Sequence, residues 1–147
     1  MTKYQLSFCT INKLSDNIAE VIIANDVEVS LEMVEEHDEI LCSIFKGNFG
    51  VLVNKINTYT YAVEATLSMG SIARMKAIAS VNYTAQGKSS SQEIENRRRT
   101  DKLNWQQFSG LELGWQQAYD WLIQELLDEN IIGTNEHSWV SYYPAED

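Results

Sequence analysis

Apolar and polar residues alternate with two different periods along this chain, and the change of period marks the expected elements. Residues 4–9 alternate with a period of two, which predicts an opening strand. Residues 12–17 are rich in turn formers and residues 18–24 follow as a second strand, so the chain is expected to begin with a hairpin. Between residues 30 and 44 the apolar positions recur at helical spacing, which predicts an amphipathic helix.

The rest of the chain continues this exchange of strands and helices. Residues 49–53 are apolar throughout, which is typical of a central strand. Residues 75–83 alternate clearly, with one apolar face and one face of Lys76, Ser80 and Asn82 that is expected to be partly wet. Capping boxes at Ser90 and Ser109 mark two helix starts. The remaining expected elements are helices at 61–69, at 91–99 and from the second capping box to about 128, and a strand at 105–108.

These elements give the order β-β-α-β-α-β-α-β-α in one α/β domain. Strands that alternate with helices after an initial hairpin imply a mixed sheet. A length of 147 residues suits a single domain with its own core. We expect the domain to cover residues 1–129 and residues 130–147 to form an acidic tail that contains the aromatic residues Trp139, Tyr142 and Tyr143.

Charge is sorted into three blocks along the chain. Residues 14–45 carry nine carboxylates and no Lys or Arg, residues 46–102 carry nine bases against four acids, and residues 103–147 carry eight acids and no base. Blocks of one sign favour partners of the other sign. The net charge of −10 argues against duplex nucleic acid as a partner, since such binding is mostly phosphate neutralisation; the three arginines at 97–99 are the one exception.

Neither a membrane span nor a targeting signal is expected. No window approaches the roughly 20 apolar residues that cross a bilayer, and the first eleven residues have no continuous apolar stretch. Cys9 and Cys42 fall in expected regular elements and not in a framework of loops. We therefore expect two free, buried thiols in a cytoplasmic protein that does not insert into membranes.

The chain carries no established catalytic or nucleotide-binding motif. His37 lies on the apolar side of a predicted helix, where a packed histidine bonded to the backbone is the favoured interpretation. The neighbouring acids cannot converge on one metal ion, because consecutive helix positions point around the axis; Glu36 and Glu39 share a face, for which a solvated acidic surface is favoured. A paired-carboxylate site stays open, although no pair stands out. A non-enzymatic protein without metal or cofactor is the resulting prediction.

Three segments, read in order, resemble one known family. They are FGVLVN at 49–54, AIASVNY at 77–83 and AYDWL at 118–122, the last with an A-x-x-W-L signature. The pattern resembles the bacterial SpoIIAA-like proteins of the STAS superfamily, named for sulfate transporters and anti-sigma factor antagonists. It is most similar to uncharacterised STAS-like members, over about residues 18–124.

The resemblance implies a four- to five-stranded mixed sheet with helices packed on one face, no cofactor, and a role in binding other proteins. In the anti-sigma antagonists, a partner kinase phosphorylates a serine in a D-S-[ST]-G motif after the central strand. The matching stretch here is 57–61, and its hydroxyls Thr58 and Thr60 are the candidate phospho-acceptors. The acid and the glycine of the motif are missing, which argues against a phosphorylation switch.

Two functions remain as hypotheses. The first is a regulatory protein-interaction module whose acidic helix and basic segment dock an unidentified protein or a second copy of the chain. The residues of these two surfaces are Glu32, Glu35, Glu36, Glu39, Arg97, Arg98 and Arg99. The alternative is a protein that binds a small ligand, a lipid or a nucleotide, in a pocket near the strand ends. The candidate pocket residues are Asn54, Tyr59, Tyr61 and Tyr83.

Overall fold

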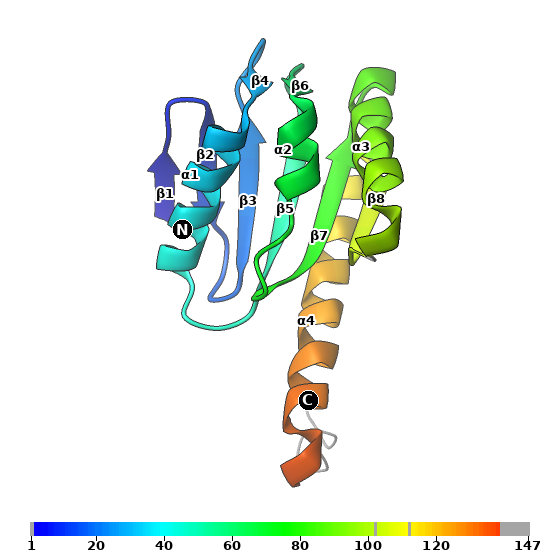
Figure 1. Ribbon diagram of the computed structural model, residues 1–147. Helices are drawn as coiled ribbons and strands as arrows, with labels where there is room; N and C mark the ends of the chain where they lie inside the picture. The colour runs from blue at the N-terminus through cyan, green and yellow to red at the C-terminus, as the bar shows by residue number, and fades with distance from the viewer. Residues whose placement is uncertain (1, 102, 112, 139–147) are drawn as a thin grey trace.

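A six-stranded mixed sheet forms the centre of the computed structural model, which describes residues 2–101, 103–111 and 113–138, with side chains to residue 127. The strand order is β1-β2-β3-β5-β7-β8 (Figure 1). The first three strands pair antiparallel, and β3, β5, β7 and β8 run parallel. Their bounds are β1 (Thr2–Gln5), β2 (Cys9–Lys13), β3 (Ile18–Ile23), β5 (Phe49–Lys55), β7 (Met75–Asn82) and β8 (Trp105–Ser109).

Three helices connect the parallel strands in turn, and a fourth helix ends the described chain. They are α1 (Leu31–Ile44), α2 (Val63–Ser68), α3 (Ala85–Arg97) and α4 (Gly114–Ser138); the 3-10 turn η1 (Arg99–Asp101) follows α3. A short parallel ladder of β4 (Glu28–Val29) and β6 (Thr60–Tyr61) lies beyond the carboxyl ends of β3 and β5 (Figure 1). The α/β class and the mixed sheet are therefore confirmed.

The predicted helix at 30–44 is confirmed as α1. The Ser30 side chain accepts a hydrogen bond from the backbone N–H of Met33 at 3.2 Å, which caps the first turn. Val34 and Leu41 are its buried residues and pack against the sheet. The acidic positions lie on the opposite, solvent-facing side, as the helical period requires.

Helices cover both faces of the sheet, so the prediction of helices on one face is wrong. Helices α1, α2 and α3 share one core with β2, β3 and β5, whereas α4 packs on the other face against Leu52 and the alanines of β7. The second face needs this cover because alternate residues of both central strands are apolar on it. The small residues there allow close approach: a side chain added at Gly50 would lie 3.0 Å from Leu122 of α4.

The polar face of β7 is less exposed than expected: Lys76 is partly exposed, but Ser80 and Asn82 are buried. Ser80 and Asn82 are covered by α3, whose Ser91 lies with its hydroxyl 2.8 Å from that of Ser80. The Ser91 hydroxyl also donates to the Asn82 side chain at 3.1 Å. Because each buried polar group finds a partner across the interface, a polar helix can pack on a polar strand face.

Two predicted helix starts are wrong. Helix α3 begins at Ala85, where Thr84 caps it by accepting from the N–H of Gly87 at 3.0 Å, so the expected loop at 85–91 is helical. Its buried positions, Gly87, Ser91 and Ile94, are mostly small or polar and give little apolar signal. Helix α4 begins at Gly114, and the Ser109 hydroxyl instead accepts from the N–H of Leu111. The expected helix at 61–69 shortens to α2 because Tyr61 belongs to β6.

The opening strand is two strands. The N–H of Leu6 donates to the carbonyl of Cys9 at 2.9 Å, so the chain turns at 6–8 and β2 pairs back onto β1. The alternation of apolar residues continues through this tight turn, so the sequence pattern gives no sign that the chain reverses there. This extra strand brings the main sheet to six strands, more than the four to five expected.

The proposed boundary at residue 129 falls inside α4, whose backbone continues to Ser138. The tail residues Trp139, Tyr142 and Tyr143 lie outside the described residues.

Gly114 is expected to tolerate no side chain. A Cβ at this position would overlap the carbonyl oxygen of Ser109, a backbone atom that cannot rotate away. Gly114→Ala should therefore lower the free energy of unfolding by about 1–3 kcal/mol, as overpacking does. Gly47→Ala is the matched control, since nothing lies within 4 Å of an added Cβ there. Urea denaturation of both variants checks the prediction, and equal stabilities would contradict it.

Candidate functional site

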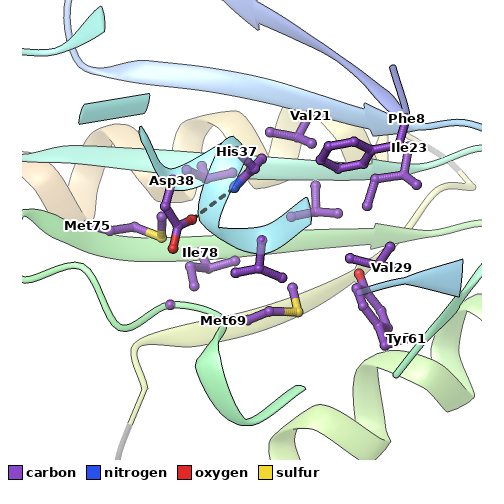
Figure 2. A pocket seen from close by; sticks show the side chains of 14 residues that line it. Phe8, Val21, Ile23, Val29, His37, Asp38, Tyr61, Met69, Met75 and Ile78 are labelled. Atoms are coloured by element: carbon purple, nitrogen blue, oxygen red, sulfur yellow. Dashed lines mark hydrogen bonds and ion pairs between the residues drawn. The ribbon is translucent and has the colours of Figure 1, made fainter. Parts of the chain in front are cut away.

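An apolar cavity of about 40 Å³ lies between the sheet and helices α1 and α2 (Figure 2). Strand residues Val21, Ile23, Val51 and Val53 form its floor, since they alternate onto this face of β3 and β5. The other apolar lining residues include Phe8, Val29, Val34, Met69, Met75 and Ile78.

A histidine–aspartate pair lies at the α1 side of this cavity. His37 Nδ1 is 3.0 Å from Asp38 Oδ1, and both side chains are partly buried and line the cavity (Figure 2). His37 was expected to bond to backbone, but its partner is the neighbouring carboxylate. The contact is possible because both residues lie at the edge of the helix face that covers the cavity.

Tyr61 places its side chain at the other side of the cavity (Figure 2). The β4–β6 ladder holds it there, through bonds from Thr60 N–H to Val27 O at 3.0 Å and from Ala62 N–H to Val29 O at 2.9 Å. The Tyr61 hydroxyl donates to the Tyr59 hydroxyl at 3.4 Å, and the two rings meet edge to face.

Lys55 completes a polar cluster with these tyrosines. It is the last residue of β5, its side chain points to the same face as Val51 and Val53, and the residue is only 2% exposed. Its Nζ lies 5.6 Å from the centre of the Tyr59 ring and 5.1 Å from that of Tyr61. The ammonium donates to the Ser90 hydroxyl of α3 at 2.9 Å. Among the described residues no carboxylate forms an ion pair with it.

Burial controls the protonation of this cluster. Removal from water lowers the pKa of the Lys55 ammonium from 10.5 to about 7, because the charged form loses most in a poorly solvated site. Burial raises the pKa of Tyr61 to about 12 and that of Tyr59 well above its usual value. At neutral pH both phenols of the cluster are therefore neutral, and the amine loses its proton far more readily than an exposed lysine does.

The four candidate pocket residues do not meet in one place. Tyr59 and Tyr61 lie together beside Lys55, whereas Asn54 points to the opposite face of β5. There the Glu20 carboxylate accepts hydrogen bonds, each of 2.9 Å, from the side chains of Asn12, Asn54 and Trp115. Because successive side chains of a strand point to opposite faces, Asn54 and Lys55 at the end of β5 lie on different sides of the sheet.

Tyr83, the fourth of these residues, directly follows the carboxyl end of β7 and is exposed. Burial and the nearby Glu20 raise the pKa of its phenol, and a hydrogen bond from the Asn54 side chain partly offsets this. It therefore belongs with the Glu20 group.

The candidate phospho-acceptors Thr58 and Thr60 are both exposed. Their backbone is held in place: the N–H of Thr58 donates to the Asn25 side chain at 2.8 Å, and its carbonyl accepts from the N–H of Asp26 at 2.7 Å. Modification of either hydroxyl stays a prediction.

The acidic face of α1 is exposed at all four expected positions, Glu32, Glu35, Glu36 and Glu39. The three arginines differ from one another. Arg97 is exposed and pairs with Glu93 at 2.9 Å, and Arg99 is exposed beside Asn96.

Arg98 is buried, which removes it from the predicted partner surface. It is 6% exposed, and its guanidinium donates to the backbone carbonyls of Thr66 and Met69 and to the Asp101 carboxylate. A further contact reaches the Ser71 hydroxyl at 3.3 Å. The side chain turns inward because α3 ends beside the carboxyl end of α2, whose free carbonyls need donors.

Exposed apolar residues gather where the parallel strands end. Ile56, Tyr83 and Leu111 follow β5, β7 and β8, which are neighbours in the sheet, and Leu113 comes two residues after Leu111. Leu111 and Leu113 are 70% and 77% exposed. Leu111 and Tyr83 also line a surface hollow of about 390 Å³, together with Lys88, Gln107 and Phe108.

Leu113 has a left-handed backbone conformation, with φ of 70°. A leucine is strained in this region, which favours glycine and asparagine. Leu113 therefore combines an exposed apolar side chain with an unfavourable backbone conformation. An outlier of this kind is a reason to expect a function at the site.

Other site types receive no support in the described part of the chain. No group of three or more His, Cys, Asp or Glu side chains could hold a metal ion there. Cys9 is buried, Cys42 is partly buried and both are free; burial raises the pKa of the Cys9 thiol to about 12, so it is not a reactive thiolate. No described helix is long and apolar enough to cross a membrane.

Sequence reasoning missed Lys55, Leu111 and Leu113. A lysine two residues after the apolar run at 49–53 was the available signal for a buried amine. The leucines were assigned to a helix start, so their exposure was not expected.

Comparison with known proteins gives no match: neither the scan against protein-family models nor the searches of curated proteins and solved structures find one. The likeness to STAS proteins therefore stays a prediction from sequence motifs.

Proposed function

We propose that this chain is a non-enzymatic, cytoplasmic, STAS-like protein-interaction module. The observation that carries the proposal is the pair of exposed leucines, Leu111 and Leu113, beside the hollow at the carboxyl edge of the sheet. Single exposed apolar residues are ordinary, but the two most exposed large apolar residues of the described chain lie in the same short loop, and one of them is strained. Burial of the two leucine side chains by a partner would offset the free-energy cost of their exposure to water and of the strained backbone at Leu113.

The hollow suggests how a partner docks. Its lining combines the rings of Tyr83 and Phe108 with the polar ends of Gln107 and Lys88. An apolar anchor residue of a partner would fill the hollow, and an acidic neighbour of that anchor would lie near Lys88. Buried aromatic contacts and a polar rim are the usual arrangement at protein interfaces.

A double variant of the loop tests this function. Leu111→Ser with Leu113→Asn removes both apolar side chains, and asparagine suits the left-handed backbone at 113, so the fold is expected to keep its stability. Retention of the partner from the host lysate should fall at least tenfold, about 1.4 kcal/mol or more. Quantitative mass spectrometry of the retained proteins gives the measurement.

The matched control is Ile123→Gln with Leu127→Gln on the exposed side of α4. These residues are each 45% exposed and lie away from the loop along the helix, and glutamine is compatible with helix. The control should retain the same partner as the unaltered chain. Loss of binding in the control alone, or equal retention by both variants, would reject the carboxyl edge as the docking surface.

A further inference from the structure

We propose that two copies of this chain associate through β8, which pairs antiparallel with β8 of the second copy so that the two sheets become continuous. In the sheet order β8 is the last strand, and no described strand pairs with its outer side (Figure 1). The proposal rests on the backbone groups along this edge. It goes beyond the proposed function, because it requires neither Leu111 nor Leu113.

The hydrogen bonds between β7 and β8 show which backbone groups of β8 face outward. The N–H of Ile78 donates to the carbonyl of Asn104 at 2.9 Å, and the N–H of Gly110 donates to the carbonyl of Asn82 at 2.7 Å. In a parallel ladder, every second residue bonds to the neighbouring strand. Residues 104, 106, 108 and 110 therefore bond to β7, and the N–H and C=O groups of residues 105, 107 and 109 point to the free edge.

Two of these outward groups are already bonded or covered. The N–H of Trp105 donates to the carbonyl of Leu103 at 2.9 Å. The Ser109 carbonyl lies against Gly114, where an added Cβ would be 1.4 Å from its oxygen. The groups that remain are the Trp105 carbonyl, both backbone groups of Gln107 and the Ser109 N–H, and these have no backbone partner among the described residues.

The remaining groups are complementary to those of a second copy that runs in the opposite direction. With a two-fold axis at Gln107, the N–H of each Gln107 would donate to the carbonyl of the other. The N–H of each Ser109 would donate to the Trp105 carbonyl across the axis. The other opposed groups, the Trp105 N–H and the Ser109 carbonyl, are the two that bond or pack within their own copy. Every outward group of this edge then has a contact, which is the self-complementarity that a two-fold interface needs.

The side chains of β8 favour a second copy of this acidic chain. The strand has the sequence WQQFS, without charge or proline, although the whole chain has a net charge of −10. Edge strands usually carry a lysine, a proline or a bulge that prevents pairing, and β1 at the opposite edge of the sheet contains Lys3. In the proposed register Gln106 lies opposite Phe108 of the second copy, which covers a partly exposed ring and brings no like charges together.

Sedimentation velocity of the full chain tests the association. We expect a reversible monomer–dimer equilibrium between about 1 µM and about 300 µM, because an edge of one short strand gives a small interface and weak binding. The dimer should persist between about 50 mM and about 500 mM NaCl, since no ion pair holds the two strands together. A chain that stays monomeric at about 300 µM would overturn the proposal, and so would a dimer that dissociates in salt.

Gln107→Pro and Gln107→Ala separate the backbone from the side chain. Both remove the side-chain hydrogen bonds to Asn82 and Glu95, but only proline also removes the outward N–H. Proline is tolerated on an edge strand where the N–H faces solvent, so the fold should persist, which circular dichroism checks. Gln107→Pro should dimerise at least tenfold more weakly than Gln107→Ala. Equal dissociation constants for the two variants would overturn the proposal.

Amide hydrogen exchange of the unaltered chain locates the interface without any variant. Exchange at Gln107 and Ser109 should slow at least about twofold when the protein concentration is raised from below to above the dissociation constant. The amides of Gln106 and Phe108 bond to β7 and are the internal control, since they should be protected at both concentrations. A dimer in which exchange at Gln107 and Ser109 does not slow would have its interface elsewhere, and the proposal would be overturned.

Discussion

Replacing Lys55 with methionine is expected to stabilise the folded protein by about 4 kcal/mol at neutral and mildly acidic pH. The amine is 2% exposed, and burial lowers its pKa from 10.5 to about 7. The unfolded chain therefore binds a proton more readily than the folded chain, and protonation favours unfolding. Methionine has a similar length and no charge, so this penalty disappears.

The gain should depend on pH in one direction. Below about pH 7 buried Lys55 lowers the free energy of unfolding by the full amount. Lysine is charged in the unfolded chain at this pH, and the same charge is unfavourable in the buried site of the folded protein. This destabilisation should shrink as the pH rises from about 7 to about 10.5, where the amine is neutral in both states. The difference between variant and unaltered protein isolates this one group.

Urea denaturation at several pH values measures the difference in unfolding free energy. Lys46→Met is the control, because Lys46 is exposed and its replacement should change stability by less than about 0.5 kcal/mol at every pH. A Lys55→Met variant that is no more stable than the unaltered protein at about pH 6 would show that the amine is not desolvated in solution.

Replacing Arg98 with alanine is expected to destabilise the protein by about 3 kcal/mol or more. The guanidinium joins the end of α3 to the carbonyls of Thr66 and Met69, which accept from no other group among the described residues outside helix α2. Its loss leaves buried carbonyls and the Asp101 carboxylate without their main partner. Removing a buried guanidinium that donates to two backbone carbonyls costs more than removing an exposed ion pair.

The neighbouring arginines are the controls for this prediction. Arg97→Ala and Arg99→Ala alter the same charge at exposed positions and should each cost less than about 1 kcal/mol. Thermal and urea denaturation of the three variants give the comparison. Similar losses at all three positions would contradict the assignment of Arg98 as a buried connection between α2 and α3.

Regular periodicity was sufficient to predict the central elements. The helix α1, the central strand β5, the strand β7 and the strand β8 were all expected close to their observed bounds. In each, apolar spacing follows directly from which side faces the core. A hairpin ending in the strand at 18–24 was also expected, but its first strand was placed at 4–9, whereas β3 pairs with β2 at Cys9–Lys13.

Helix α3 shows where periodicity fails. Its buried side is made by Gly87, Ser91 and Ile94, and two of these are small or polar. The face is buried because Ser80 and Asn82 of β7 pair with Ser91, a contact between two elements and not within the helix. No count of apolar residues within the helix could have revealed it.

The candidate sites divide in the same way. Tyr59 and Tyr61 are expected as pocket residues; their side chains contact each other, and only Tyr61 lines the cavity. Asn54 was placed with them, but its neighbour Lys55 is the residue that shares their face, because adjacent strand residues point to opposite sides. The sequence predicted the region and missed the central amine.

The sequence by itself determined the α/β class, the mixed sheet and the acidic surface of α1, because local periodicity and charge follow from residue type alone. Only the tertiary structure decided that α4 covers the second face, that Arg98 is buried between two exposed arginines, and that Lys55 has no acidic partner among the described residues. These outcomes depend on which distant backbone and side-chain groups meet. Burial and pairing across elements therefore decide the chemistry of residues that look alike in the chain.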